Sequence, residues 1–151
     1  MGAGQVISRL KLRWNGRPGN SVSETTGSFQ KLFYLVLLYA VVRFILLIFE
    51  LIHIDDDING AQVDGFLVGA VLSDFIHYSF FGLTVYVLVN VRQQVRQRYG
   101  IPGHVNEDCV CSCCCPCFVA GQMLRHTTDY DVYPATCCTD RGIPAHAPSI
   151  V

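Results

Sequence analysis

Leu32 to Ile52 reads LFYLVLLYAVVRFILLIFELI, and Phe66 to Val91 reads FLVGAVLSDFIHYSFFGLTVYVLVNV. An α-helix rises 1.5 Å per residue, so roughly 20 apolar residues cross the ~30 Å hydrocarbon layer of a bilayer. Both runs reach that length. The sequence therefore predicts two transmembrane helices, at 32–52 and 66–91, the second of which continues to about residue 99.

The composition agrees with a membrane protein, because 51% of the residues are hydrophobic and only 15% are charged. Two buried helices of this length would need a larger core than 151 residues normally form. We predict an all-α membrane protein, a two-span antiparallel helical hairpin followed by a small cysteine-rich domain. The sequence lacks a phosphate loop, a nucleophile beside an evident base, and zinc-protease spacing, so we expect neither an enzyme nor a nucleic-acid partner.

Basic residues beside the two runs predict their orientation. Five Lys or Arg and one Glu lie in residues 1–31, three arginines follow the second run, and the acidic loop 53–65 has no Lys or Arg. Because Lys and Arg stay on the cytoplasmic side, or on its matrix or stromal equivalent, both termini are expected there. Within the basic segment 1–31, Gln5 to Trp14 is interpreted either as a helix lying on the membrane surface or as part of a flexible tail.

Charged residues inside the spans need polar partners. Arg43 lies in the first run and Asp74 in the second, at nearly the same depth in an antiparallel hairpin. We therefore predict an intramembrane polar pair of Arg43 with Asp74, with Ser73 and His77 nearby. A structural clamp that fixes helix register is favoured over a conduction or proton-relay role.

The acidic loop contains half of a calcium-binding pattern. Asp55, Asp57, Asn59 and the following glycine reproduce D-x-D-x-N-G, in which oxygen ligands alternate. The twelfth position of an EF-hand loop should be Glu but is Phe66, and Asp64 is the available substitute. The pattern therefore favours an acidic, helix-ending turn over a calcium site.

Cysteines are concentrated after the second run, where six of the nine residues in CVCSCCCPC, Cys109 to Cys117, are cysteine. In the cytosol thiols stay reduced, and thiolates select zinc or similar soft cations. The candidate zinc ligands are Cys114, Cys117, Cys137 and Cys138, with Cys109, Cys111 and Cys115 as alternates. Two other uses stay open: burial of the charge-free segment 109–124 in protein or at the membrane interface, and lipidation or disulfide formation.

The cysteine segment resembles the domain shared by placenta-specific 8, cornifelin, the plant cadmium-resistance proteins and the plant cell-number regulators. The resemblance covers roughly residues 92–142, which places a cysteine-rich domain at 100–142 and a tail at 143–151. The family usually has a cysteine directly before the glutamine, whereas here Gly121 precedes Gln122. The matching residues are Arg96, Arg98, Tyr99, Ile101, Gly103, Asp108, Cys109, Cys114, Cys115, Pro116, Cys117, Gln122 and Arg125.

The resemblance implies a small membrane protein that binds or helps to move divalent metal. Two spans cannot enclose a pore, so we expect self-association. The alternative is a structural accessory subunit of a large membrane complex, whose partners are lipids and other subunits. The resemblance implies the plasma membrane, with an organellar membrane as the alternative.

Overall fold

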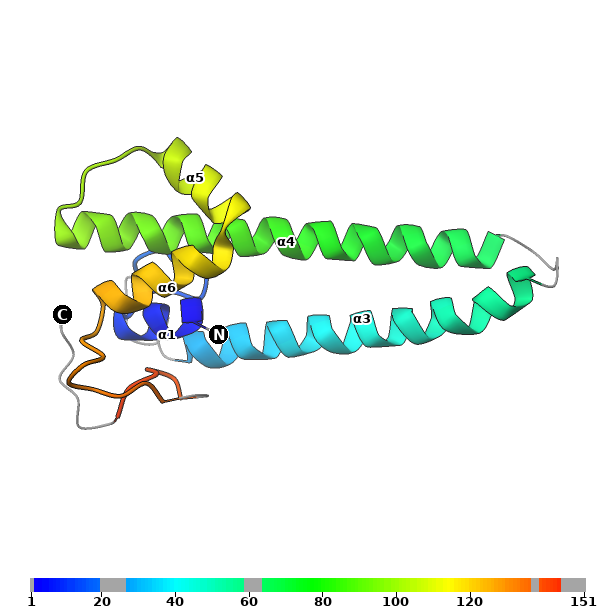
Figure 1. Ribbon diagram of the computed structural model, residues 1–151, viewed down its shortest axis with the longest axis horizontal. Coiled ribbons are helices and arrows are strands. Elements are labelled where there is room, and N and C mark those ends of the chain that lie inside the picture. The colour runs from blue at the N-terminus through cyan, green and yellow to red at the C-terminus, as the bar shows by residue number, and fades with distance from the viewer. Residues whose placement is uncertain (1, 20–26, 59–63, 137–138, 145–151) are drawn as a thin grey trace. The chain divides into compact units, whose positions relative to one another are not determined.

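The computed structural model describes residues 2–19, 27–58, 64–136 and 139–144, and these form helices with no β-strand among them. The predicted all-α class is confirmed. The helices run in the order shown in Figure 1: α1 at Gly2–Arg9, α3 at Ser28–Ile58, α4 at Asp64–Tyr99, α5 at Val105–Cys114 and α6 at Pro116–His126.

Two of these helices are long and apolar enough to cross a membrane. The first candidate span is Ser28–Ile52 of α3, with a mean hydropathy of 2.6, and the second is Leu67–Tyr99 of α4, with a mean hydropathy of 1.4. None of the most apolar stretch of α3 is buried inside the protein. α3 extends beyond the predicted span at 32–52 on both sides, because flanking polar residues continue the same helical backbone. α4 begins two residues before the predicted span at 66–91 and ends at Tyr99, where its continuation was predicted to end.

The chain divides into two compact units. The first, called here the packed unit, combines Met1–Phe33 with Thr84–Val151, and the second, called the span unit, is Tyr34–Leu83. From the sequence, the N-terminal segment and the cysteine-rich segment were predicted to be separate parts. The structure packs them together, because α1 is too short to bury its apolar side chains by itself.

The core of the packed unit is formed by three helices. From α1 come Val6 and Ile7, and Leu10 follows directly after the helix. They pack with valines and a leucine of α4 (Val87, Leu88, Val91 and Val95) and with Val119 and Met123 of α6. Each fully buried aliphatic side chain contributes about 1.5–3 kcal/mol. The apolar face of α1 is therefore covered by protein, unlike the surface-lying helix or flexible tail that the sequence suggested.

A tight turn brings the segment after α1 against α4. Backbone hydrogen bonds join Arg13 to Arg17 and Gly16 to Arg13, each at 2.9 Å. Gly16 has a φ of 79°, and a Cβ there would lie 2.8 Å from a methyl carbon of Val91. Glycine is therefore needed both for the backbone conformation and for the close approach. Asn90 completes the contact by donating to the carbonyl of Asn15 at 3.2 Å.

The span unit is held by contacts between the side chains of α3 and α4. The rings of Tyr39 and Phe80 stack with centroids 3.9 Å apart, and Gly69 lets the ring of Phe49 approach the α4 backbone. Many large apolar side chains, such as Phe44 and Phe75, are exposed in this unit. A surface of that kind needs an apolar solvent or a partner.

Candidate functional site

Six cysteines form an exposed surface on α5 and α6, called here the thiol surface. Its members are all free and exposed: Cys109, Cys111, Cys113, Cys114, Cys115 and Cys117. The buried side of α5 consists of Asp108 and Ser112, which lie one helical turn apart. The four cysteines of α5 lie on its exposed sides, so they are available to solvent, metal or lipid.

The turn between α5 and α6 lies inside the thiol surface. Cys115 ends α5 and begins α6, with φ −137° and ψ 58°, and Pro116 follows as the first residue of α6. Proline restricts the preceding residue to non-helical conformations and fits the first turn of a helix, where no N–H is required. The sequence CCPC therefore breaks one helix and starts the next, which places thiols on both.

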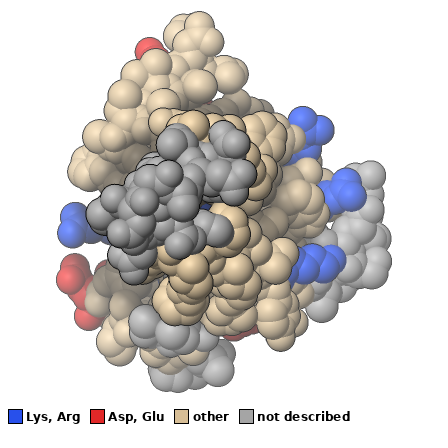
Figure 2. Space-filling model, turned by 90° about the vertical axis from the view of Figure 1, so that its right-hand side faces the viewer, with Lys and Arg blue, Asp and Glu red and all other residues tan. Residues whose placement is uncertain are grey.

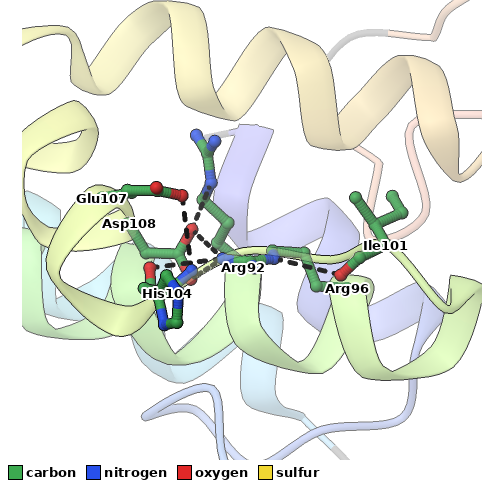
Figure 3. A network of polar contacts seen from close by, with 6 residues as sticks. All are labelled: Arg92, Arg96, Ile101, His104, Glu107 and Asp108. Atoms are coloured by element: carbon green, nitrogen blue, oxygen red, sulfur yellow. Dashed lines mark hydrogen bonds and ion pairs between the residues drawn. The ribbon is translucent and has the colours of Figure 1, made fainter.

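A buried ion pair attaches α5 to α4 (Figure 3). The carboxylate of Asp108 is only 1% exposed. It forms an ion pair with Nε of Arg92 at 2.8 Å and accepts a hydrogen bond from Nη1 of Arg96 at 2.7 Å. A carboxylate removed from water needs such partners, and two guanidinium groups supply them. We call this group the aspartate anchor.

The loop before α5 is shaped around the same arginine. Arg96 also donates to the carbonyls of Ile101 and His104, each at 3.4 Å. Gly103 has a φ of 148°, and a Cβ at this position would lie 1.9 Å from Nη2 of Arg96. At the start of α5, the side chain of Glu107 accepts a hydrogen bond from the N–H of His104 at 3.3 Å. The family-like residues Arg96, Gly103 and Asp108 thus act together to position α5.

The predicted zinc ligands are only partly within the described residues. Cys114 and Cys117 lie on the thiol surface, whereas Cys137 and Cys138 fall outside the residues that the structure describes. Among the described residues, no three His, Cys, Asp or Glu side chains come together as a group that could hold a metal ion. The alternates Cys109, Cys111 and Cys115 do not complete such a group either. The four-sulfur site stays a prediction.

The intramembrane polar residues make contacts within the span unit. Arg43 donates a hydrogen bond to the hydroxyl of Ser73, and the hydroxyl of Tyr39 lies 2.9 Å from Nδ1 of His77. Asp74 is exposed, and none of the ion pairs found between described residues joins it to Arg43. Arg43 thus bonds the hydroxyl of Ser73, one residue before Asp74, the predicted partner.

Sequence reasoning missed Glu50, which lies within the first candidate span. Its Oε1 is buried and has no hydrogen-bond partner in the structure. The signal was present, because Glu50 follows Arg43 by seven residues, about two helical turns, and so shares its face of α3.

The possible calcium loop lies at the edge of the described residues. Asn59 is outside them, as are the side chains of Asp55, Asp57 and Asp64. The backbone of α3 is helical as far as Ile58, so the first two aspartates lie on a helix and not in the predicted turn.

A second buried charge, Arg9, was also missed. This side chain of α1 is 7% exposed and donates to the carbonyl of Arg141 at 2.6 Å, to the hydroxyl of Thr127 at 3.0 Å and to the hydroxyl of Tyr130 at 3.1 Å. The guanidinium group also lies 5.7 Å from the centre of the Tyr130 ring. We call this group the Arg9 clasp. Its partners lie more than a hundred residues away, so no local pattern could indicate them.

These features define a small helical protein with two long apolar helices and a thiol-rich packed unit. The sequence matches the model of the PLAC8 family over residues 4–126, and the chain belongs to that family, as the resemblance predicted. The match begins within α1 and ends with α6, so it includes both apolar helices as well as the cysteine segment. Neither a curated protein nor a solved structure matches the chain.

Proposed function

We propose that this protein is a two-span integral membrane protein whose thiol surface takes soft divalent metal ions as cargo, in an assembly of more than one copy. The observation that carries the proposal is the exposure of six free thiols within nine residues. Free cysteines are usually buried as small hydrophobes, so exposing six of them suggests use of their chemistry.

Membrane insertion is supported by the surface of the span unit. Phe44, Phe75 and Tyr78 are each more than 60% exposed. In the view of Figure 2, most of the coloured surface is neither basic nor acidic. Lipid would cover such side chains without a protein partner. The proposed arrangement is an antiparallel hairpin with both termini on the side of the basic flanks, which is the cytoplasmic side or its equivalent.

Thiolates are the ligands that zinc and cadmium prefer, and structural zinc sites usually have four donors. Cys109 and Cys113 are four residues apart on α5 and therefore share a face. Because three donors do not meet among the described residues, the remaining sulfurs must come from a second copy or from Cys137 and Cys138. Self-association also fits a protein whose described residues contain two candidate spans.

The test is metal stoichiometry of the full chain, purified in detergent under reducing conditions. Elemental analysis is combined with native mass spectrometry to count chains. If two copies share a site, about one zinc per two chains is expected, and replacing Cys109 and Cys113 with Ser should abolish binding. If Cys137 and Cys138 complete the site, about one zinc per chain is expected, and replacing those two should abolish it. Absence of zinc and cadmium in the wild-type protein would overturn the metal proposal.

A gain-of-function variant sharpens this test. Gly121 occupies the position where the family usually has cysteine, one turn after Cys117 on α6, and a Cβ there would meet no atom within 4 Å. Gly121→Cys should therefore bind zinc more tightly than the wild type in competition with a chelator. Gly121→Ser is the matched control, because it adds a side chain of similar size without a thiolate.

The alternative function is a structural accessory subunit of a larger membrane complex. The exposed apolar side chains of the span unit favour this alternative if a protein neighbour covers them instead of lipid. This alternative predicts metal-free protein that co-purifies with the same membrane subunit at a fixed ratio, and that retains this ratio when the thiols are replaced with Ser.

A further inference from the structure

We infer that the thiol surface is a site of S-acylation, in which long-chain fatty acyl groups on Cys113, Cys114, Cys115 and Cys117 hold the α5–α6 turn at the inner face of the bilayer. The inference rests on the proposed membrane insertion. It does not depend on metal binding.

The aspartate anchor fixes the direction in which α5 runs. Arg96 contacts the loop before α5 as well as Asp108, whereas Arg92, one turn earlier on α4, forms an ion pair with Asp108. Advancing along α5 therefore means moving back along α4, as Figure 1 shows. The residues of α4 before Arg92 form its apolar part. Cys114 follows Asp108 by six residues, or about 9 Å of helix. The last thiols thus lie on the apolar side of Arg92.

The level of the bilayer surface on α4 is indicated by interfacial residues just before Arg92. Tyr86 is partly exposed, and the guanidinium group of Arg17 lies 5.8 Å from the centre of its ring. Trp14, in the turn that packs on this part of α4, is also exposed. Tyr and Trp are enriched where a membrane meets water, and Arg extends its charge toward the water. Val119, three residues after the start of α6, packs in the same core cluster as Val87 and Val91 of this stretch of α4.

The surface around the four thiols is suited to lipid. No Lys, Arg, Asp or Glu lies between Asp108 and Arg125. Val110 on α5 and Phe118 on α6 are 62% and 66% exposed, respectively, although both are large apolar side chains. Exposing such a surface to water is unfavourable, whereas burying it in the interfacial region of a bilayer is favourable. Thiols located there are close to the acyl chains that would modify them.

The chemistry is an acyl transfer from a long-chain acyl-coenzyme A. The cysteine Sγ loses its proton and attacks the thioester carbonyl carbon, a new carbon–sulfur bond forms, and the bond to coenzyme A breaks. Coenzyme A leaves as a thiolate and takes up the proton, so no oxidant or reductant is required. One acyl chain gives only weak membrane attachment, and each further chain strengthens it. An acylated sulfur is no longer a thiolate ligand, so acylation and metal binding exclude each other at the same cysteine.

The experiment is to express the full chain in eukaryotic cells, label it with an alkyne analogue of palmitate, and map hydroxylamine-sensitive adducts by mass spectrometry. We expect adducts on Cys113, Cys114, Cys115 and Cys117, and loss of most of the label when these four are replaced with Ser. Replacing Cys109 and Cys111, which lie closer to the aspartate anchor, should retain most of it. Mapping on the wild-type protein requires no variant, so misfolding of a variant cannot obscure the result.

A positional control uses the buried side of α5. In the variant lacking the four cysteines, Ser112→Cys should not restore label, because Ser112 is fully buried. Phe118→Cys, at an exposed position next to Cys117, should restore part of it. Absence of hydroxylamine-sensitive adducts on the wild type, or their restriction to Cys109 and Cys111, would overturn the inference. Extraction with alkaline carbonate tests the proposed insertion separately: an unacylated protein that resists extraction contradicts only the acylation.

Discussion

The packed unit and the span unit differ in which side chains they bury and which they expose. In the packed unit, charged side chains such as Arg9 and Asp108 are buried and fully partnered, and apolar residues from three helices form a core. In the span unit, large apolar side chains point outward, and the contacts between helices are few and partly polar. The first unit therefore depends on specific long-range contacts, whereas the second depends on helix formation and on its surrounding solvent.

The largest expected effect is on the aspartate anchor. Replacing Asp108 with Ala leaves Arg92 and Arg96 without their buried partner, so we expect a loss of about 3–5 kcal/mol in the stability of the packed unit. Hydrogen–deuterium exchange of the detergent-solubilised protein should show faster exchange of the α5 and α6 amides. Exchange in the span unit should stay unchanged.

Glu107→Gln is the matched control for this variant. Glu107 is the neighbouring acidic residue, but it is exposed and accepts a hydrogen bond from the N–H of His104. The neutral amide can still accept that bond, so we expect less than about 1 kcal/mol of change. Equal effects of the two variants would show that the anchor does not hold α5.

The Arg9 clasp should produce the next largest effect. Arg9→Gln removes hydrogen bonds to the C-terminal segment, and bonds to charged groups contribute about 1.5–3 kcal/mol each before compensation by water. We expect a net loss of about 2–3 kcal/mol and faster proteolysis after α6. Lys11→Gln, which changes an exposed charge two residues later, should leave proteolysis unaffected. Retention of the wild-type cleavage rate by Arg9→Gln would contradict the clasp.

The contrast between the units also explains which features the sequence could predict. Apolar run length indicated both long helices, and the CCPC pattern with its preceding Arg, Gly and Asp residues indicated the family. Docking of α1 could not be predicted, because an eight-residue amphipathic helix fits a membrane surface as well as a protein core. The Arg9 clasp depends on which side chains tertiary packing brings together. Ser73 was predicted to lie near Arg43, but its hydrogen bond to Arg43 in place of the Asp74 ion pair depends on the same packing.

A glycine pair tests whether the loop before α5 is shaped around Arg96. Gly103→Ala would place a methyl group on the guanidinium of Arg96, while Gly100→Ala meets no atom within 4 Å. Both glycines have positive φ, so both variants carry backbone strain of about 1–3 kcal/mol. We expect Gly103→Ala to cost about 1 kcal/mol more, with faster exchange in α5 only for that variant. Identical exchange in the two variants would show that Arg96 can move aside.

The smallest effect is expected in the span unit, where Tyr39→Phe removes the hydrogen bond to His77 but keeps the stack on Phe80. Hydrogen bonds between membrane helices average about 0.6 kcal/mol, because the unfolded helices find other partners in the bilayer. Unfolding in mixed detergent micelles should therefore shift only slightly.

Tyr78→Phe is the control for that measurement, since the Tyr78 side chain is exposed and its ring meets His77 only edge-on. A double-mutant cycle of Tyr39→Phe with His77→Leu isolates the coupling between the two side chains. A coupling as large as the loss in Asp108→Ala would mean that the span unit also depends on a specific polar contact. The difference between the units would then lie in how many such contacts each contains, and not in how each is stabilised.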